Sequence, residues 1–192
     1  DKYIDSNQKI SENVVWGVSK RISCEDAGIC GYSDSDISPE TAVRIAAAYA
    51  SLLPKISSLV IACDGTPASS MLKRAAISGA ISQGIDVYSL PYMPFTLFSF
   101  AIKTLDTKGG IYISTNEDSR SLNIILCDEI GAAIDSSKRR KFTQVFSRGE
   151  VLPSTQKEIG IVDEFGGIKN SYEAKLKKVI DTELLLNATK TI

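Results

Sequence analysis

Short apolar runs alternate with segments of helical periodicity along most of the chain. The runs are rich in Val, Ile and Leu and are bounded by Gly, Pro or Asp, which is typical of buried strands. The segments between them repeat apolar residues at intervals of three and four, which is typical of helices that cover a sheet. The pattern therefore predicts an α/β layer fold. The expected strands include 59–62, 85–90, 122–127 and 159–162.

Several helix boundaries carry recognisable signals. Ser38-Pro39-Glu40 combines an N-cap serine, a proline at the first helical position and an acid in the first turn. Gly84 ends a second helix, whose small residues suggest close packing on a sheet, and Pro94 opens a third. Two more helices are expected over 136–149 and 171–186.

The stretch from Gly109 to Asp118 is the centre of the predicted fold. A glycine pair opens it, the apolar run Ile111-Tyr112-Ile113 follows, and a polar segment closes it. This order predicts a short buried strand whose carboxyl end delivers a loop to solvent. Ligands of open α/β sheets bind at such strand ends, so this loop is the first candidate for a functional site.

The same stretch resembles a motif of the α-D-phosphohexomutases, Gly-Gly-Ile-x-Ile-Thr-Ala-Ser-His-Asn-Pro. Aligned on this sequence, the serine that carries the phosphoryl group falls on Asn116, the histidine on Glu117 and the asparagine on Asp118. A carboxamide cannot form the phosphate ester that the family's reaction requires. Ser114 and Ser119 are the hydroxyls nearby that would have to replace it.

Three more segments resemble the family but have lost its basic residues. Residues 25–32 resemble a Gly-Ile-Arg-Gly segment with Cys30 in place of the arginine; we favour a Cys30 that only fills apolar space. In 63–70, which resembles Arg-Asp-Thr-Arg-Pro-Ser-Ser, Asp64 and Pro67 match while Cys63 and Thr66 replace the arginines. Where the family has Asn-Gly-Ile-Lys, around 122–131, the lysine is missing.

The resemblance implies a three-layer α/β/α sandwich with a mixed sheet, similar to domain I of the phosphohexomutases. The loops 63–69 and 114–121 should then lie together at one edge of the sheet. Active members move a phosphoryl group between the 1- and 6-positions of a hexose, with Mg²⁺ held by a second domain; no metal or cofactor is expected in this chain itself. The candidate phosphate or sugar contacts are Cys30, Asp64, Thr66, Thr115, Glu117 and Asp118.

Three regions are expected along the chain. Residues 1–18 repeat apolar positions every six residues, which indicates either the end of a hexapeptide β-helix or a linker. Residues 19–150 form the α/β/α domain, and 151–192 form a connector and a helix that leads to a second domain. The combination is similar to fusions of a mannose-1-phosphate guanylyltransferase with a phosphomannomutase, so we expect the chain to be a piece of a longer protein.

The composition of the chain excludes several kinds of binding partner and catalytic site. The net charge of −1 and the pI near 5.6 give no basic footprint for nucleic acid, and no apolar run suffices for a membrane helix. The chain has no histidine, which excludes Ser-His-Asp triads and histidine metal sites. Its four cysteines include no C-x-x-C pair, which favours reduced thiols and a cytoplasmic location.

Three functional hypotheses follow from the residues and the resemblance. The first is a non-catalytic structural or regulatory domain of a sugar-nucleotide or sugar-phosphate protein, whose partners are the other domains of the parent chain. The second is a working mutase that uses Ser114 or Ser119, and the third is a sensor that binds hexose phosphates without turnover. Whether the protein forms a homo-oligomer stays open.

The basic run 138–141 is interpreted as a solvated helix face rather than a phosphate patch.

Overall fold

The computed structural model describes residues 23–25, 28–32, 37–116, 121–149 and 151–179, and the hexad-like segment 1–18 lies outside them. Its centre is a mixed seven-stranded sheet with the order β1-β2-β6-β5-β3-β4-β7. The strands β3, β4, β5 and β7 run parallel, whereas β6 pairs antiparallel with both β5 and β2. The strands are β1 Ser23–Glu25, β2 Gly28–Tyr32, β3 Ser58–Cys63, β4 Asp86–Ser89, β5 Gly110–Thr115, β6 Ser121–Cys127 and β7 Val162–Glu164.

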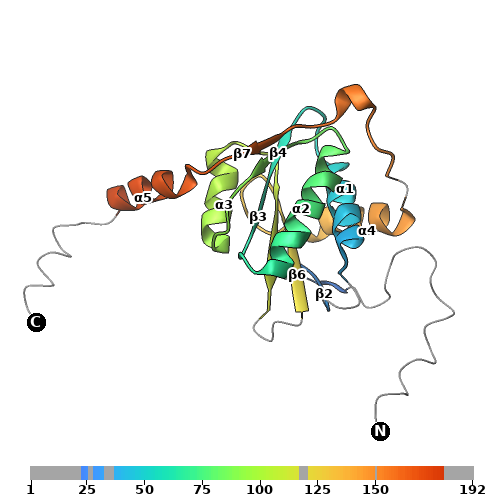
Figure 1. The fold of residues 1–192 in the computed structure, drawn as a ribbon, viewed down its shortest axis with the longest axis horizontal. Helices are drawn as coiled ribbons and strands as arrows, with labels where there is room; N and C mark the ends of the chain where they lie inside the picture. The colour runs from blue at the N-terminus through green and yellow to red at the C-terminus, as the bar shows by residue number, and fades with distance from the viewer. Residues whose placement is uncertain (1–22, 26–27, 33–36, 117–120, 150, 180–192) are drawn as a thin grey trace, which may run out of the picture.

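Helices cover both faces of this sheet (Figure 1). On one face, α1, α2 and α4 pack on Ile61, Ile111 and Ile113 of the central strands. On the other face, α3 and the first residue of α5 pack on Val60 and Tyr112. The expected three-layer α/β/α sandwich with a mixed sheet is confirmed. The helices are α1 Pro39–Ala50, α2 Pro67–Ile81, α3 Phe95–Thr104, α4 Ser136–Arg148 and α5 Ile168–Val179, and a 3₁₀ turn spans Gln156–Glu158.

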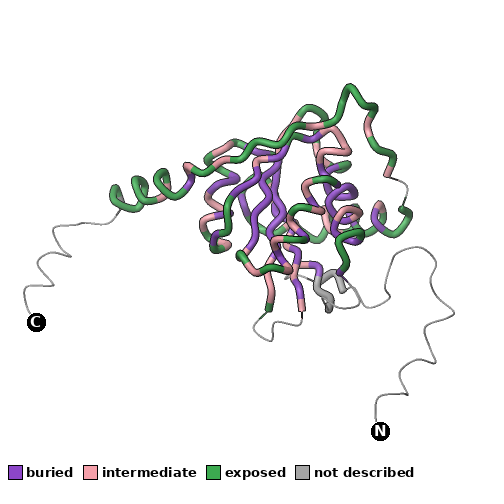
Figure 2. Tube along the Cα trace, viewed as in Figure 1, coloured by how far each residue is buried: buried purple, intermediate pink, exposed green. Residues whose placement is uncertain are grey.

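Burial follows the layers, because the central strands lie between two sets of helices (Figure 2). The strand β5 is buried from Gly110 to Ile113 and becomes partly exposed at Ser114 and Thr115, and Asn116 is exposed. The predicted strand that delivers a loop to solvent is therefore confirmed. Within the described residues, no helix is both long and apolar enough to span a membrane.

The capping signals in the sequence act as predicted. The hydroxyl of Ser38 accepts a hydrogen bond from the Thr41 amide at 3.2 Å, with Pro39 at the first helical position. At the start of α2, Thr66 caps in the same way and Pro67 follows. These caps fix the points at which the chain leaves the sheet edge and enters a helix.

One helix contact differs from the expectation. The small residues of α2 were expected to pack on the sheet, but Gly79 packs on α1 instead, where an added Cβ would lie 2.2 Å from the Val43 carbonyl oxygen. Leu72 and Ala76 of the same helix belong to the core between helices and sheet. The small residues of α2 thus serve the helix–helix contact as well as the sheet.

The boundaries of the last elements also differ from the sequence prediction. The strand expected at 159–162 forms at Val162–Glu164, as an edge strand beside β4. The helix expected from 171 already begins at Ile168, whose side chain is buried against α3. The strands β1 and β2 were not predicted.

Candidate functional site

The candidate site lies where the parallel strands β3 and β5 end. The Asp64 amide, just after β3, donates a hydrogen bond to the Ile113 carbonyl of β5 at 3.1 Å. One carboxylate oxygen of Asp64 then accepts hydrogen bonds from the Thr115 amide at 2.7 Å and the Thr115 hydroxyl at 2.9 Å. The prediction that the loops after the two strands meet at one sheet edge is confirmed for the described residues.

The second carboxylate oxygen of Asp64 organises its own loop. It accepts hydrogen bonds from the Thr66 amide at 3.0 Å, the Thr66 hydroxyl at 3.1 Å and the hydroxyl of the fully buried Ser69. Partial burial raises the pKa of Asp64, but the hydrogen bonds from Ser69, Thr115 and Thr66 outweigh it and hold the pKa below its usual value. Asp64 is therefore an ionised residue that joins two loops.

Thr66, one of the candidate ligand residues, is the N-cap of α2. Its hydroxyl accepts a hydrogen bond from the Ser69 amide at 3.3 Å and donates to Asp64. The role of Thr66 that the structure describes is thus to build the loop, and a contact with phosphate stays a prediction.

Asn116, which the motif resemblance aligns with the family's phosphoserine, follows β5 directly. Its amide donates a hydrogen bond to the Ser121 carbonyl at 2.9 Å, and its side-chain Nδ2 donates to the Ser121 hydroxyl at 3.0 Å. The side chain thus ties the two ends of the loop together. Glu117, Asp118 and Ser119 lie outside the described residues.

The other two candidates lie in the sheet itself. Ser114 of β5 is paired with Asn123 of β6, and Asn123 is paired with Cys30 of β2. The backbones of Ser114 and Cys30 are therefore level with each other but separated by one strand. Since β5 holds Ser114 in the ladder next to Thr115, this serine lies within the strand and not at the loop position of the family's nucleophile.

Cys63, where the family has its first arginine, belongs to the core. Only 3% of its surface is exposed, and its sulfur lies 3.8 Å from the Ser70 hydroxyl. Cys63 and Cys127 are both free thiols. Neither Cys63 nor the capping residue Thr66 presents a cation to the loop.

One cation near this edge was missed by sequence reasoning. Lys73 lies on α2, and its ammonium group donates a hydrogen bond to the Leu90 carbonyl, at the end of β4. Burial lowers the pKa of Lys73, and the neighbouring Cys63 and Glu164 partly offset the effect. The sequence gives no signal for this contact, because a lysine between helix residues is normally solvated.

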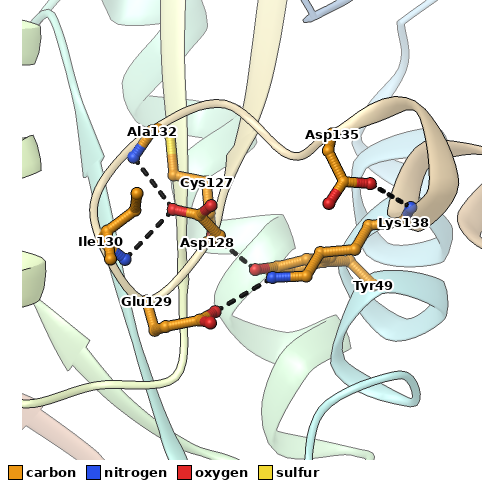
Figure 3. A network of polar contacts seen from close by, with 8 residues as sticks. All are labelled: Tyr49, Cys127, Asp128, Glu129, Ile130, Ala132, Asp135 and Lys138. Atoms are coloured by element: carbon orange, nitrogen blue, oxygen red, sulfur yellow. Dashed lines mark hydrogen bonds and ion pairs between the residues drawn. The ribbon is translucent and has the colours of Figure 1, made fainter.

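A second polar network lies at the opposite end of the β5–β6 hairpin (Figure 3). The Tyr49 hydroxyl of α1 donates to the Cys127 carbonyl at 2.6 Å, and burial raises the pKa of Tyr49. Asp128 accepts hydrogen bonds from the Ile130 and Ala132 amides at 3.1 and 3.0 Å. These contacts fix the turn that follows β6.

The described residues do not fit a magnesium site. They contain no group of three or more carboxylate or thiol side chains that could hold a metal ion. Asp64, the carboxylate at the candidate loop, already accepts five hydrogen bonds on its two oxygens.

The structure thus has an α/β/α fold with the candidate loop at the carboxyl edge of its parallel strands. The sequence model for the family described as phosphoglucomutase/phosphomannomutase, alpha/beta/alpha domain I, matches residues 21–151. The chain therefore belongs to this family.

Comparisons with single proteins agree with the family. The chain is 28% identical over 154 residues to a protein of Pyrococcus horikoshii named "Probable phosphoglucosamine mutase", covering 80% of this chain and 34% of that protein. It is 26% identical over 163 residues to the phosphoglucomutase/phosphomannomutase of Thermococcus kodakarensis, covering 82% of this chain and 36% of that protein. The chain thus spans about a third of the length of these relatives.

The fold is also similar to solved structures of the family. A phosphoglucomutase/phosphomannomutase family protein from Burkholderia thailandensis superposes with a TM-score of 0.69 at 17% identity, over 82% of this chain and 35% of that one. This likeness supports the assignment of the three-layer fold.

Proposed function

We propose that this chain is a phosphohexomutase domain I that carries no phosphoryl group and has a structural or regulatory role in a larger protein. The observation that carries the proposal is Asn116, which occupies the phosphoserine position and uses its side-chain amide to tie the loop to Ser121. An amide lacks the hydroxyl oxygen that forms and breaks a phosphate ester.

The surroundings of Asn116 support the same conclusion. A transferring phosphoryl group is stabilised by cations and aligned donors. Here Cys63 is buried in the core, Thr66 caps a helix, and the Thr115 hydroxyl is bound to Asp64. Lys73 is engaged with the Leu90 carbonyl. In the described part of the loop, the side chain at position 116 therefore offers no hydroxyl, and Cys63, Thr66 and Lys73 present no free cation to it.

The names of the relatives indicate the chemistry of the parent protein. They are mutases of glucosamine, glucose or mannose phosphates. We infer that the parent acts in hexose-phosphate metabolism, in the manner of a guanylyltransferase/phosphomannomutase fusion, and that the partners of this domain are the other domains of that chain.

A turnover assay of the full-length parent tests the proposal. With mannose 1-phosphate, glucose 1,6-bisphosphate and Mg²⁺, we expect no mannose 6-phosphate above the enzyme-free rate, while an active phosphomannomutase assayed in parallel converts the same substrate. The proposal is wrong if the native protein converts the substrate and the Ser114→Ala or Ser119→Ala variant does not. The chain would then belong to a mutase with a displaced nucleophile, since in-line transfer requires one positioned hydroxyl.

A further inference from the structure

A pocket of about 600 Å³ opens at the edge of the sheet opposite to Asn116. The pairing of β5 with β6 separates the two edges by the length of the hairpin. Gly110 is opposite Cys127 at one end, and Thr115 is opposite Leu122 at the other. The pocket lies beside the Cys127 end, between the end of α1, the turn before β5 and the start of α4. It is therefore separate from the loop of the proposed function.

The floor of the pocket is apolar. Leu52, Leu53 and Pro54, which follow the end of α1, line the pocket together with Ile134 from the segment before α4. Leu52 is 38% exposed, so this apolar surface is open to solvent. A volume of this size and an apolar lining with a few charged groups are typical of small-molecule sites.

Three lysines and two carboxylates surround this floor. Lys138 forms an ion pair with Glu129 at 3.0 Å (Figure 3). The Glu129 amide, the Lys138 ammonium and the more distant Lys108 keep the pKa of Glu129 below its usual value. Asp128 accepts two amide hydrogen bonds. The lining thus carries one more positive than negative charge.

Two of the three lysines are available to a ligand. Lys108 has only a 4.0 Å contact with Asp106, whose side chain is 97% exposed. Lys141 forms no ion pair with another residue of the described part of the chain, and it lies one turn after Lys138 on α4. Lys141 helps to lower the pKa of Asp135, and Lys108 helps to lower that of Glu129, but among the described residues neither ammonium group has an ion pair closer than 4.0 Å. Two such ammonium groups match the charge of one phosphate monoester, and lysine binds phosphate as a point charge.

We propose that this pocket binds a phosphate monoester that also carries an aromatic ring, such as a nucleoside monophosphate, and that it is a ligand site distinct from the mutase-like loop. The ring lies on the floor of Leu52, Leu53, Pro54 and Ile134, and the phosphate lies between Lys108 and Lys141. A hexose phosphate fits less well, because the sugar hydroxyls would lose water on a floor that offers them no partner. Lys141 belongs to the basic run 138–141, so this run has a binding role beyond a solvated helix face.

Titration of the ¹⁵N-labelled chain with AMP, followed by amide NMR shifts, tests the site. We expect saturable shifts that concentrate at residues 51–54, 108, 134 and 138–141, with dissociation constants at least tenfold weaker for adenosine, inorganic phosphate and glucose 1-phosphate. Shifts at residues 114–116 instead, equal affinity for inorganic phosphate and AMP, or no saturation up to 10 mM AMP would overturn the proposal.

Two variants and a matched control locate the phosphate. The double variant Lys108→Gln/Lys141→Gln should weaken AMP binding at least tenfold, whereas Lys157→Gln, a lysine outside the pocket lining, should leave it unchanged. Leu52→Glu places a negative charge in the apolar floor, at a side chain that is 38% exposed, and should weaken AMP binding by a similar factor without removing a core residue. Unchanged AMP affinity in either pocket variant, in a protein whose amide spectrum shows the native fold, contradicts the assignment.

Discussion

At the scale of single residues, Asp64 determines the geometry of the candidate loop. Its carboxylate accepts hydrogen bonds from Thr66, Ser69 and Thr115, which belong to two chain segments about fifty residues apart. Charge-assisted hydrogen bonds of this kind stabilise more than neutral ones. Asp64 therefore has a structural role in this chain, because its hydrogen bonds join the two loops.

Replacing Asp64 by asparagine should destabilise the chain by about 1–3 kcal/mol, because an NH₂ group takes the place of one acceptor and faces another donor. Urea unfolding followed by circular dichroism measures this difference. Asp163→Asn is the matched control, since Asp163 is exposed on the edge strand β7, and it should change the free energy of unfolding by less than about 0.5 kcal/mol. A loss of similar size in both variants would show that Asp64 does not join the loops.

The effect of Asp64 should also depend on pH. Its pKa in the folded chain is lowered, so its contribution is fully present above the unfolded value of about 3.9 and is lost as the pH falls through the folded pKa. The difference in the free energy of unfolding between the native chain and Asp64→Asn should be constant from pH 7 to about pH 5 and should shrink below about pH 4. If the difference in the free energy of unfolding instead grows as the pH falls, the lowered pKa of Asp64 is contradicted.

At the scale of elements, the sequence pattern predicts strands with buried side chains and misplaces the exposed edge strand. The strands β3, β4 and β6 were located because each contains buried apolar residues in a short segment between turn signals. The edge strand β7 was misplaced, because the exposed side chains of Val162, Asp163 and Glu164 do not mark it. Its position depends on backbone pairing with β4, and a hydrophobic pattern does not encode pairing.

At the candidate loop, too, local features were predicted and contacts between distant segments were not. The apolar run before Asn116 was predicted, because it is a local signal, whereas Thr66 was interpreted only as a candidate ligand residue and its role as the N-cap of α2 was not predicted. The hydrogen bonds between Asp64 and Thr115 and the contact of Lys73 with Leu90 join distant segments. Such contacts depend on strand order, which one sequence does not give directly.

The contact between α1 and α2 allows a test at this scale. Gly79→Ala should destabilise the chain by about 1–3 kcal/mol, because the added methyl group would collide with the Val43 carbonyl at 2.2 Å. Helix propensity alone predicts the opposite, a gain of about 0.5–1 kcal/mol. Gly166→Ala, which meets no atom within 4 Å, should be nearly neutral in the same thermal unfolding experiment. A stabilised Gly79→Ala variant would mean that the two helices lie further apart.

At the scale of the whole molecule, the domain has the fold of its family, and we propose that its loop has lost most of the charges that bind phosphate. We therefore expect the 192-residue chain to bind mannose 1-phosphate or glucose 1-phosphate with a dissociation constant above about 1 mM, weaker than −4.1 kcal/mol. Isothermal titration calorimetry measures this affinity. Tight binding that depends on the phosphate and weakens in Thr66→Ala would favour a sugar-phosphate sensor. The parent protein can still bind such ligands through other domains.

The proposed loss of the phosphoryl carrier is tested most directly by intact-mass spectrometry of the full-length parent after incubation with glucose 1,6-bisphosphate and Mg²⁺. The side chain of Asn116 cannot form the ester, and few cations offset the charge of a phosphate at this loop. We predict no added phosphoryl group on residues 114–121, in the native protein or in Asn116→Ser, while an active phosphomannomutase treated in the same way gains one. A phosphoryl group on Ser114 or Ser119 of the native protein would contradict the proposal and identify the chain as part of a working mutase.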